Sequence, residues 1–236
     1  MADPASRSAL DLYARVEDLL GVQEAAPDLY AHYLRALQSL QFDALLDVGC
    51  GGGAFIASMQ KAFPYAAFRG IDLSPHMVAR ARMLGVEADA IDVCDVAGHF
   101  GVITAVFDML NYLDSDALKR FGACLRARLD PGGVFLCDVN TRYGFETVAV
   151  GSFIAEDAER FVAIDSDVDG NVYQADFTLF SRDDTGWQRS DATIRQHYHT
   201  PEGLADALGM EAIEAVPVML YAAEEPDKIF YRFRLG

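Results

Sequence analysis

Several features that mark other protein classes are scarce in this sequence of 236 residues. Basic residues are few: 19 Lys and Arg stand against 36 Asp and Glu, which gives a formal net charge of −17. A surface of this kind repels phosphate backbones and anionic lipids, so the composition predicts neither nucleic acid nor a membrane as a partner. Only four cysteines occur, and none has Cys-x-x-Cys spacing. We therefore expect reduced thiols and no metal site.

Long apolar runs are also missing. The longest apolar stretches, such as AVPVMLYAA, are much shorter than the roughly 20 residues of a membrane-spanning helix. The N-terminus, MADPASRSALDLY, lacks the basic region and apolar block of a secretion signal. These absences predict a soluble, cytoplasmic protein. Because 52% of the residues are hydrophobic and 11% aromatic, the chain can bury a core of its own.

Apolar periodicity divides the first 140 residues into alternating elements. Residues 9–20 and 28–40 repeat apolar side chains every three or four positions and predict helices. Continuous apolar runs, typical of strands buried on both faces, follow at residues 44–49, 66–73, 86–93, 102–108 and 133–140. The segments between them predict helices, one of them with Ser74 as N-cap and Pro75 in the first turn. This order predicts a parallel, doubly wound sheet.

The pattern changes after Asn140. Extended, alternating segments over 159–170, 171–183 and 186–200 predict a small antiparallel sheet inserted after the fifth strand. A capped helix and two closing strands then complete an α/β fold with a Rossmann-like, mostly parallel, seven-stranded sheet. The parts that we expect are an N-terminal helical cap (1–42), a core (43–140 and 200–236) and an inserted substrate, lid or dimerisation region (141–199).

The stretch LLDVGCGGGAF, residues 45–55, carries the strongest functional signal. Glycines between a strand and a helix let a ligand approach the backbone closely. The segment satisfies the dinucleotide pattern G-x-G-x-x-A, with Asp72 about where a ribose-binding acid is expected. Asp47 favours a different ligand, because a carboxylate at that point repels a pyrophosphate and attracts a cationic amino group.

LLDVGCGGG, GIDLSPHM, AIDVCDV and FDMLNYL together resemble the cofactor site of class I S-adenosylmethionine-dependent methyltransferases. The closest resemblance is to the small-molecule branch with nucleotide-sugar N-methyltransferases and relatives of glycine N-methyltransferase. It implies S-adenosyl-L-methionine as cofactor and S-adenosyl-L-homocysteine as product. The residues that it places at the cofactor are Asp47, Gly49, Cys50, Gly51, Gly53, Asp72, Leu73, Met77, Asp92, Val93, Phe107, Asp108, Asn111 and Tyr112, with Tyr13 and Tyr33 from the N-terminal helices.

Some of these implied roles have simpler alternatives. The resemblance assigns the ribose hydroxyls to Asp72 and the adenine amino group to Asp92. Asp92 can also be a solvated turn residue, and Asp108 can cap the helix that follows it. The tyrosines of the first two helices can be ordinary residues of amphipathic helices.

For the reaction, we expect methyl transfer to a small-molecule acceptor, to nitrogen rather than oxygen, because a neutral amine needs no strong base. Candidate catalytic residues are Asn140 and Tyr143, just past the fifth strand, and His197 on the inserted sheet. The strand face that carries His197 either lines the active site or faces solvent.

Two other functions stay open at this point. An NAD(P)-dependent oxidoreductase would rest on the G-x-G-x-x-A pattern alone. A catalytically silent S-adenosylmethionine-binding protein would have the same sequence motifs, since methyl transfer needs few identifiable catalytic residues. A homodimer through the inserted sheet is a further expectation.

Overall fold

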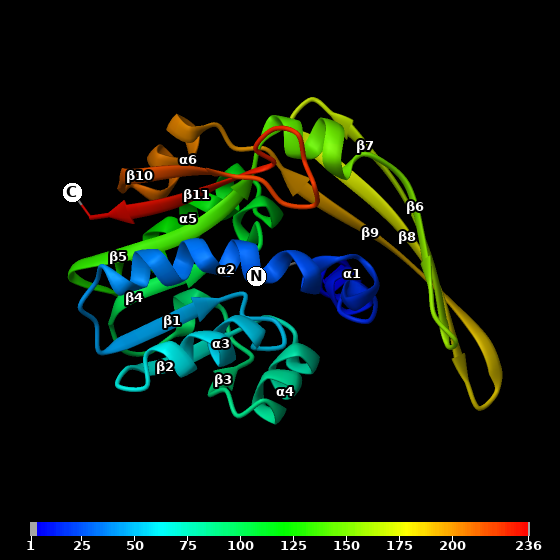
Figure 1. Ribbon diagram of the computed structural model, residues 1–236, viewed down its shortest axis with the longest axis horizontal. Helices are drawn as coiled ribbons and strands as arrows, with labels where there is room; N and C mark the ends of the chain where they lie inside the picture. Colours follow the sequence, from blue (N-terminus) through cyan, green and yellow to red (C-terminus); the bar gives the residue numbers. More distant parts are fainter. Residues whose placement is uncertain (1–3, 236) are drawn as a thin grey trace.

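The computed structural model describes residues 4–235, which form two β-sheets (Figure 1). Residues 1–3 of the predicted cap and Gly236 of the predicted core lie outside the described residues. The larger sheet has seven strands in the order β10-β11-β5-β4-β1-β2-β3. Its strands are β1 (Ala44–Val48), β2 (Ala67–Ile71), β3 (Ala88–Asp89), β4 (Phe100–Ala105), β5 (Leu129–Asn140), β10 (Glu211–Val218) and β11 (Lys228–Arg234). The first five are parallel, and β11 and β10 are antiparallel to their neighbours.

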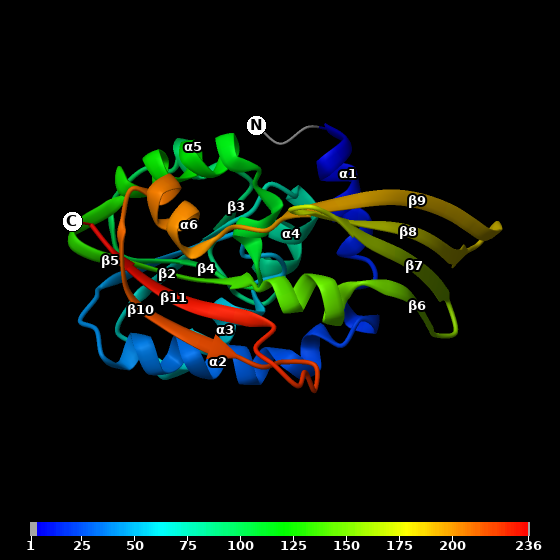
Figure 2. The same ribbon diagram turned by 90° about the horizontal axis from the view of Figure 1, so that it is seen from above.

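Helices cover both faces of this sheet (Figure 2). One face packs against α2 (Val22–Gln38), α3 (Ala54–Ala62) and α4 (Pro75–Met83), and the other against α5 (Ser115–Arg126) and α6 (Pro201–Leu208). This two-sided burial explains why the central strands are continuous apolar runs. The predicted α/β class, with a mostly parallel seven-stranded sheet, is confirmed.

The smaller sheet extends away from the carboxyl ends of the parallel strands (Figure 1). Its strands are β6 (Gly151–Glu156), β7 (Arg160–Asp169), β8 (Val172–Asp183) and β9 (Gly186–His197), all antiparallel. Helix α1 (Pro4–Tyr13) packs on one face of this sheet. The buried residues between them include Leu12, Phe177 and Ile194. The alternating residues of β8 therefore lie as predicted, with one face of the strand buried and the other more exposed.

Local sequence signals have the predicted effect at several element ends. The Ser74 hydroxyl accepts a hydrogen bond from the Met77 amide and caps α4, with Pro75 in the first turn. A single two-residue turn at Gly170 and Asn171 joins β7 and β8.

Three element boundaries differ from the prediction. The first helix ends at Tyr13, and residues 17–19 form a separate 3₁₀ helix, η1 (Glu17–Leu19). The reason is tertiary: Glu17 pairs with Arg80, and Arg160 binds both Asp18 and the Arg15 carbonyl. Strand β3 keeps only Ala88–Asp89 of the predicted segment. Strand β6 was not predicted, because it is almost wholly exposed and shows no apolar alternation.

The prediction of four reduced cysteines is wrong in this structure. Cys94 and Cys124 form a disulfide that joins η2 (Val93–Asp95) to α5. Cys50 and Cys137 are free and buried. The two bonded cysteines are 30 residues apart in sequence, so spacing rules for local pairs do not detect them.

Candidate functional site

A cavity of about 1750 Å³ opens at the carboxyl ends of the parallel strands. Its walls come from the loops after β1, β2, β3 and β4, from α1 and α2, and from residues of β8 and β9. Open α/β sheets bind ligands at this edge. The volume exceeds the roughly 300–1,000 Å³ of an ordinary small-molecule pocket, so there is room for two ligands side by side.

The glycine loop after β1 presents bare backbone to this cavity. Gly49 has φ +74°, and a Cβ there would lie 2.6 Å from Cγ of Met109. Gly51 has φ +51°, and a Cβ there would come within 4 Å of Met77 Cε alone, at 3.7 Å. Gly51 lines the cavity, and its positive φ explains the glycine.

Asp72 ends β2 beside this loop. One carboxylate oxygen accepts the Gly51 amide at 2.9 Å and the other accepts the Ser74 amide at 2.8 Å. Burial raises the pKa of Asp72, and the amide hydrogen bonds act in the opposite direction. Each oxygen keeps a lone pair free for a further donor such as a hydroxyl.

Asp47 is 2% exposed at the end of β1 and also lines the cavity. The Thr104 hydroxyl donates to its carboxylate at 2.7 Å. Burial raises the pKa of Asp47 to about 7, although the hydrogen bond from Thr104 opposes the shift. No basic side chain of the described residues forms an ion pair with Asp47. The site therefore favours a cationic ligand group beside this carboxylate.

Asp92 and Val93 line the cavity where η2 begins. One oxygen of Asp92 accepts the Cys94 amide at 3.0 Å, and the other accepts Arg120 Nη2 of α5 at 3.2 Å. Together with the Cys94–Cys124 disulfide, this contact fixes the loop to α5. The protein already supplies one donor to each Asp92 oxygen.

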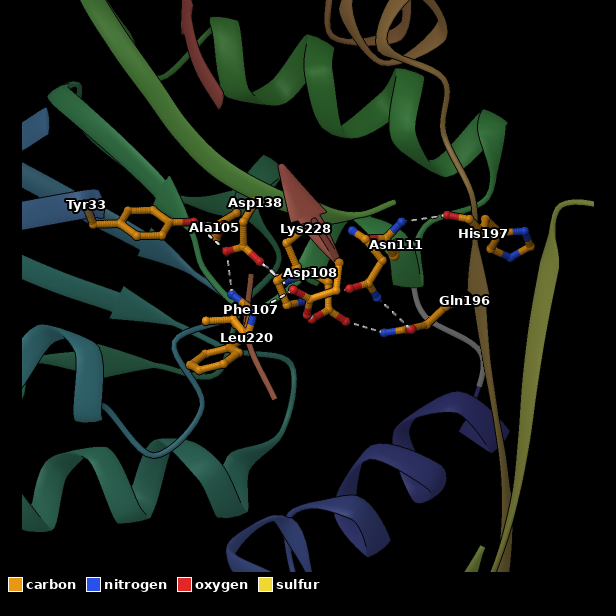
Figure 3. Close-up of polar contacts among 12 residues, drawn as sticks. Tyr33, Ala105, Phe107, Asp108, Asn111, Asp138, Gln196, His197, Leu220 and Lys228 are labelled. Atoms are coloured by element: carbon orange, nitrogen blue, oxygen red, sulfur yellow. Dashed lines mark hydrogen bonds and ion pairs between the residues drawn. The ribbon is translucent and has the colours of Figure 1, made fainter. Parts of the chain in front are cut away.

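Asp108 lies on the cavity wall just after β4. Its backbone is in the left-handed region, with φ 48°. Lys228 donates to one of its carboxylate oxygens and Gln196 donates to the other at 2.5 Å (Figure 3). Asp138, fully buried in β5, accepts the amides of Phe107 and Asp108 at 2.8 Å each. A network of buried polar groups therefore determines where Asp108 lies.

Most of the residues predicted for the site lie together on the cavity wall. The predicted residues that line it are Tyr13, Asp47, Gly49, Cys50, Gly51, Asp72, Leu73, Met77, Asp92, Val93, Phe107, Asp108, Tyr112 and His197. His197 is half-buried, and its neighbours along the strand face, Arg195 and Asp191, also line the cavity.

Five predicted site residues are not part of the wall. Gly53 starts α3, where a Cβ would lie 2.9 Å from that of Ala81. The Tyr33 hydroxyl is buried and donates to Asp138 at 2.6 Å. Asn111 donates to the His197 carbonyl and accepts the Asn140 amide. Asn140 also accepts Lys228 Nζ at 2.6 Å, whereas the Tyr143 hydroxyl accepts the Glu224 amide at 3.3 Å.

Sequence reasoning missed Lys228, Gln196, Asp138 and Tyr221. A signal existed for Asp138, because a carboxylate within the apolar run GVFLCDVN is costly to bury without partners. Lys228 and Gln196 carried no local signal, since their partner Asp108 is 120 and 88 residues away in sequence.

Comparison with known proteins agrees with this geometry. Residues 45–133 match the family described as "Methyltransferase domain". The chain is 37% identical over 133 residues to a ubiquinone biosynthesis O-methyltransferase of Xanthomonas oryzae pv. oryzae, an alignment that covers 51% of this chain and 53% of that protein. The chain thus spans about half the length of the curated relatives that it matches.

Two solved structures extend the likeness over most of the chain. One is an S-adenosylmethionine-dependent methyltransferase from Clostridium acetobutylicum, with a TM-score of 0.77, 22% identity and coverage of 95% of this chain and 99% of that one. The other is CalS10, an amino pentose methyltransferase from Micromonospora echinaspora, with a TM-score of 0.67, 26% identity and coverage of 94% and 96%.

The fold is that of class I methyltransferases, and residues 45–133 match a methyltransferase domain, as the sequence motifs predicted. S-adenosylmethionine is the cofactor of the structural relatives whose likeness covers most of the chain. The residues present fit this cofactor, because bare backbone and two carboxylates, Asp47 and Asp72, share one cavity wall. These findings favour it over the nicotinamide alternative.

No group of three or more His, Cys, Asp or Glu side chains with the geometry of a metal site occurs among residues 4–235. None of their helices is both long and apolar enough to span a membrane.

Proposed function

We propose that this protein transfers the methyl group of S-adenosylmethionine to an amine nitrogen of a small molecule. The observation that carries the proposal is the charge of the cavity wall. Three arginines line it, namely Arg80, Arg120 and Arg195. Eight carboxylates line it, namely Glu17, Asp47, Asp72, Asp92, Asp108, Asp114, Asp176 and Asp191. Arg80 and Arg120 already pair with Glu17 and Asp92. Such a wall attracts cations and repels carboxylate or phosphate acceptors.

For the cofactor, we propose that Asp72 binds the ribose hydroxyls and Asp47 the amino group, with the glycine loop beneath the methionine part and Asp92 and Val93 at the adenine. When bound, S-adenosylmethionine supplies a methyl group on sulfur: the acceptor lone pair forms the N–C bond, and the C–S bonding pair stays on sulfur. The chain has to orient the acceptor and exclude water, which α1 and the inserted sheet do by covering the cavity.

Nitrogen is favoured over oxygen for a chemical reason. A hydroxyl acceptor needs a strong base or a metal, and the described residues supply no metal cluster. The amino pentose methyltransferase among the structural relatives supports the same choice, while the O-methyltransferase relative supports the alternative. The catalytic role predicted for His197 stays a prediction, because its ring points away from Asp108 while its neighbour Gln196 faces that carboxylate (Figure 3). We propose that Asn140 acts through Lys228. The role predicted for Tyr143 stays a prediction.

The remaining predictions are kept as parts of this proposal. Residues 1–42 would form the cap, 43–140 and 200–236 the core, and 141–199 a substrate-covering region. The net charge of −17 supports a small molecule rather than nucleic acid as acceptor. A homodimer and a cytoplasmic location stay predictions.

The test is an acceptor screen with the purified protein, read by mass spectrometry as S-adenosylhomocysteine formed. Amines such as D-glucosamine, putrescine and phenethylamine would be compared with catechol and citrate. Turnover with amines is the expected result. Turnover with catechol or citrate alone would overturn the choice of nitrogen. Cofactor binding without turnover across a wide panel would favour a catalytically silent binding protein.

A further inference from the structure

Lys228 is a buried cation directly beneath the floor of the cavity. It is the first residue of β11, is 2% exposed and does not line the cavity itself. Its Nζ donates to Asp108 and to Asn140 Oδ1, and it lies 3.7 Å from Asp138 (Figure 3). A lysine is rarely buried unless it is paired, so these partners explain its position.

The backbone that carries Asp108 is strained and held in place. Phe107 and Asp108 have φ values of 57° and 48°, which non-glycine residues seldom adopt. Strain of this kind costs about 1–3 kcal/mol per residue and persists only where the surroundings enforce it. Here Asp138 enforces it, because its carboxylate accepts both amides and the Tyr33 hydroxyl.

Lys228 lies between two carboxyl groups. Asp138 accepts hydrogen bonds from three donors, and Asp108 accepts from Lys228 and Gln196. Burial raises the pKa of Asp138. Burial alone would lower the pKa of Lys228, but the nearby carboxyl groups outweigh it and raise that pKa. Of the two carboxyl groups, Asp108 is the one that reaches the cavity, with its side chain 15% exposed.

Several ionisable groups surround Asp108. On the cavity side they are Tyr13 of α1, Tyr112 of η3 (Met109–Tyr112), Tyr173 of β8 and Tyr221 of the loop after β10. On the buried side they are Asp138, Asp227 and Lys228. Lys228 is the only cation of this group, so it alone offsets the repulsion between Asp108 and the other acids.

We propose that Asp108 is a catalytic residue that binds the acceptor nitrogen, and that Lys228 is the positioning residue that keeps Asp108 directed into the cavity. The inference rests on the proposed transfer to nitrogen. The neutral amine donates an N–H hydrogen bond to Asp108. As the N–C bond forms and the C–S bond breaks, positive charge arises on nitrogen, where the carboxylate stabilises it. The product leaves as an ammonium ion and loses its proton to water.

Kinetics of two variants test the proposal with an amine acceptor found in the screen. Asp108→Asn should lower kcat about 100- to 1,000-fold and leave S-adenosylhomocysteine affinity within about threefold, because the lost stabilisation belongs to the transition state. Lys228→Met should also lower kcat with the amine acceptor and leave S-adenosylhomocysteine affinity within about threefold, because Asp108 loses the donor that positions it. Lys228→Arg should restore kcat in part. Asp116→Asn and Lys119→Met, both on the exposed face of α5, are the matched controls.

A second measurement needs no acceptor. The chain has three lysines, Lys61, Lys119 and Lys228, so ¹³Cε-lysine NMR gives three assignable signals. Lys228 should titrate above the other two, and Asp108→Asn should lower its titration. A Lys228 signal unchanged by Asp108→Asn, or full amine turnover by that variant, would overturn the inference. If the wild type methylates amines but the Asp108→Asn results contradict the inference, the proposed function still holds. If the wild type methylates only catechol, the proposed transfer to nitrogen is itself wrong.

Discussion

The two ends of the cavity are assembled in different ways. The end that we assign to the cofactor takes Asp47, Asp72 and Asp92 from successive turns after β1, β2 and β3, all within one contiguous segment. The end that we assign to the acceptor takes Asp108, Gln196 and Lys228 from segments up to 120 residues apart. The first is a local feature of the fold, and the second exists only when the whole chain has folded. Four experiments test this difference between the two ends of the cavity.

The largest effect is expected from the Cys94–Cys124 disulfide. Closing a loop of 30 residues stabilises a fold by about 3–4 kcal/mol, so Cys94→Ser/Cys124→Ser should lower Tm by roughly 6–12 °C. Calorimetry with and without a reducing agent measures this. The reductant should change only the wild type. An unchanged wild-type Tm on full reduction, verified by thiol titration, would show that the covalent link is not needed to hold η2 on α5.

The next effect concerns Asp72. Asp72→Ala would remove the two charge-assisted hydrogen bonds that we propose to the ribose, each of about 1.5 kcal/mol or more, so S-adenosylhomocysteine affinity should fall about 100-fold in calorimetric titration. Asp89→Ala is the control, because Asp89 pairs with Arg69 and Arg82 and does not line the cavity. Equal losses in the two variants would contradict a direct contact.

Asp47 should make cofactor binding depend on pH. Its pKa is raised to about 7, and a cationic ligand favours the ionised form. Below pH 7 the carboxyl must lose a proton on binding, so S-adenosylmethionine affinity should rise with pH by up to about tenfold per unit and level off above 7. Asp47→Asn should flatten the curve. Calorimetric titrations with the cofactor in buffers of different ionisation enthalpy would detect the proton released on binding. If no proton is released, Asp47 does not become ionised when the cofactor binds.

The smallest effect is expected at the far end of the inserted sheet. Trp187 is 53% exposed at the start of β9, outside the cavity. Trp187→Ser should change the free energy of unfolding by less than about 0.5 kcal/mol and leave both cofactor affinity and turnover as they are. Loss of turnover in this variant would show that the sheet tip takes part in acceptor binding.

The sequence predicted many of the residues that line the glycine-loop end of the cavity, because the signals there are local. A few neighbouring residues are enough to interpret the glycines between a strand and a helix, and the same holds for Asp72 at the end of an apolar run. Strand and helix order followed from periodicity for the same reason. Strand β6 was missed because it is exposed and has no apolar alternation. The end of the first helix at Tyr13 was missed because ion pairs between distant residues determine it.

The acceptor end could not be derived in this way. Asp108 was noticed as part of FDMLNYL, but its partners lie in β9 and β11, and only the packing of these strands brings them together. Asn140 and Tyr143 are close in sequence, yet one binds Lys228 and the other contacts the Glu224 amide. Sequence proximity to the end of a strand does not indicate which side chains point inward.

Helix α1 is attached to both ends of the cavity. Its Asp11 accepts the Ser74 hydroxyl at 2.5 Å, Arg80 donates to the Ala14 carbonyl beyond its last residue, and its apolar face packs on the inserted sheet. Because these three attachments join α1 both to α4 and to the inserted sheet, any outward movement of the helix would have to break all of them together.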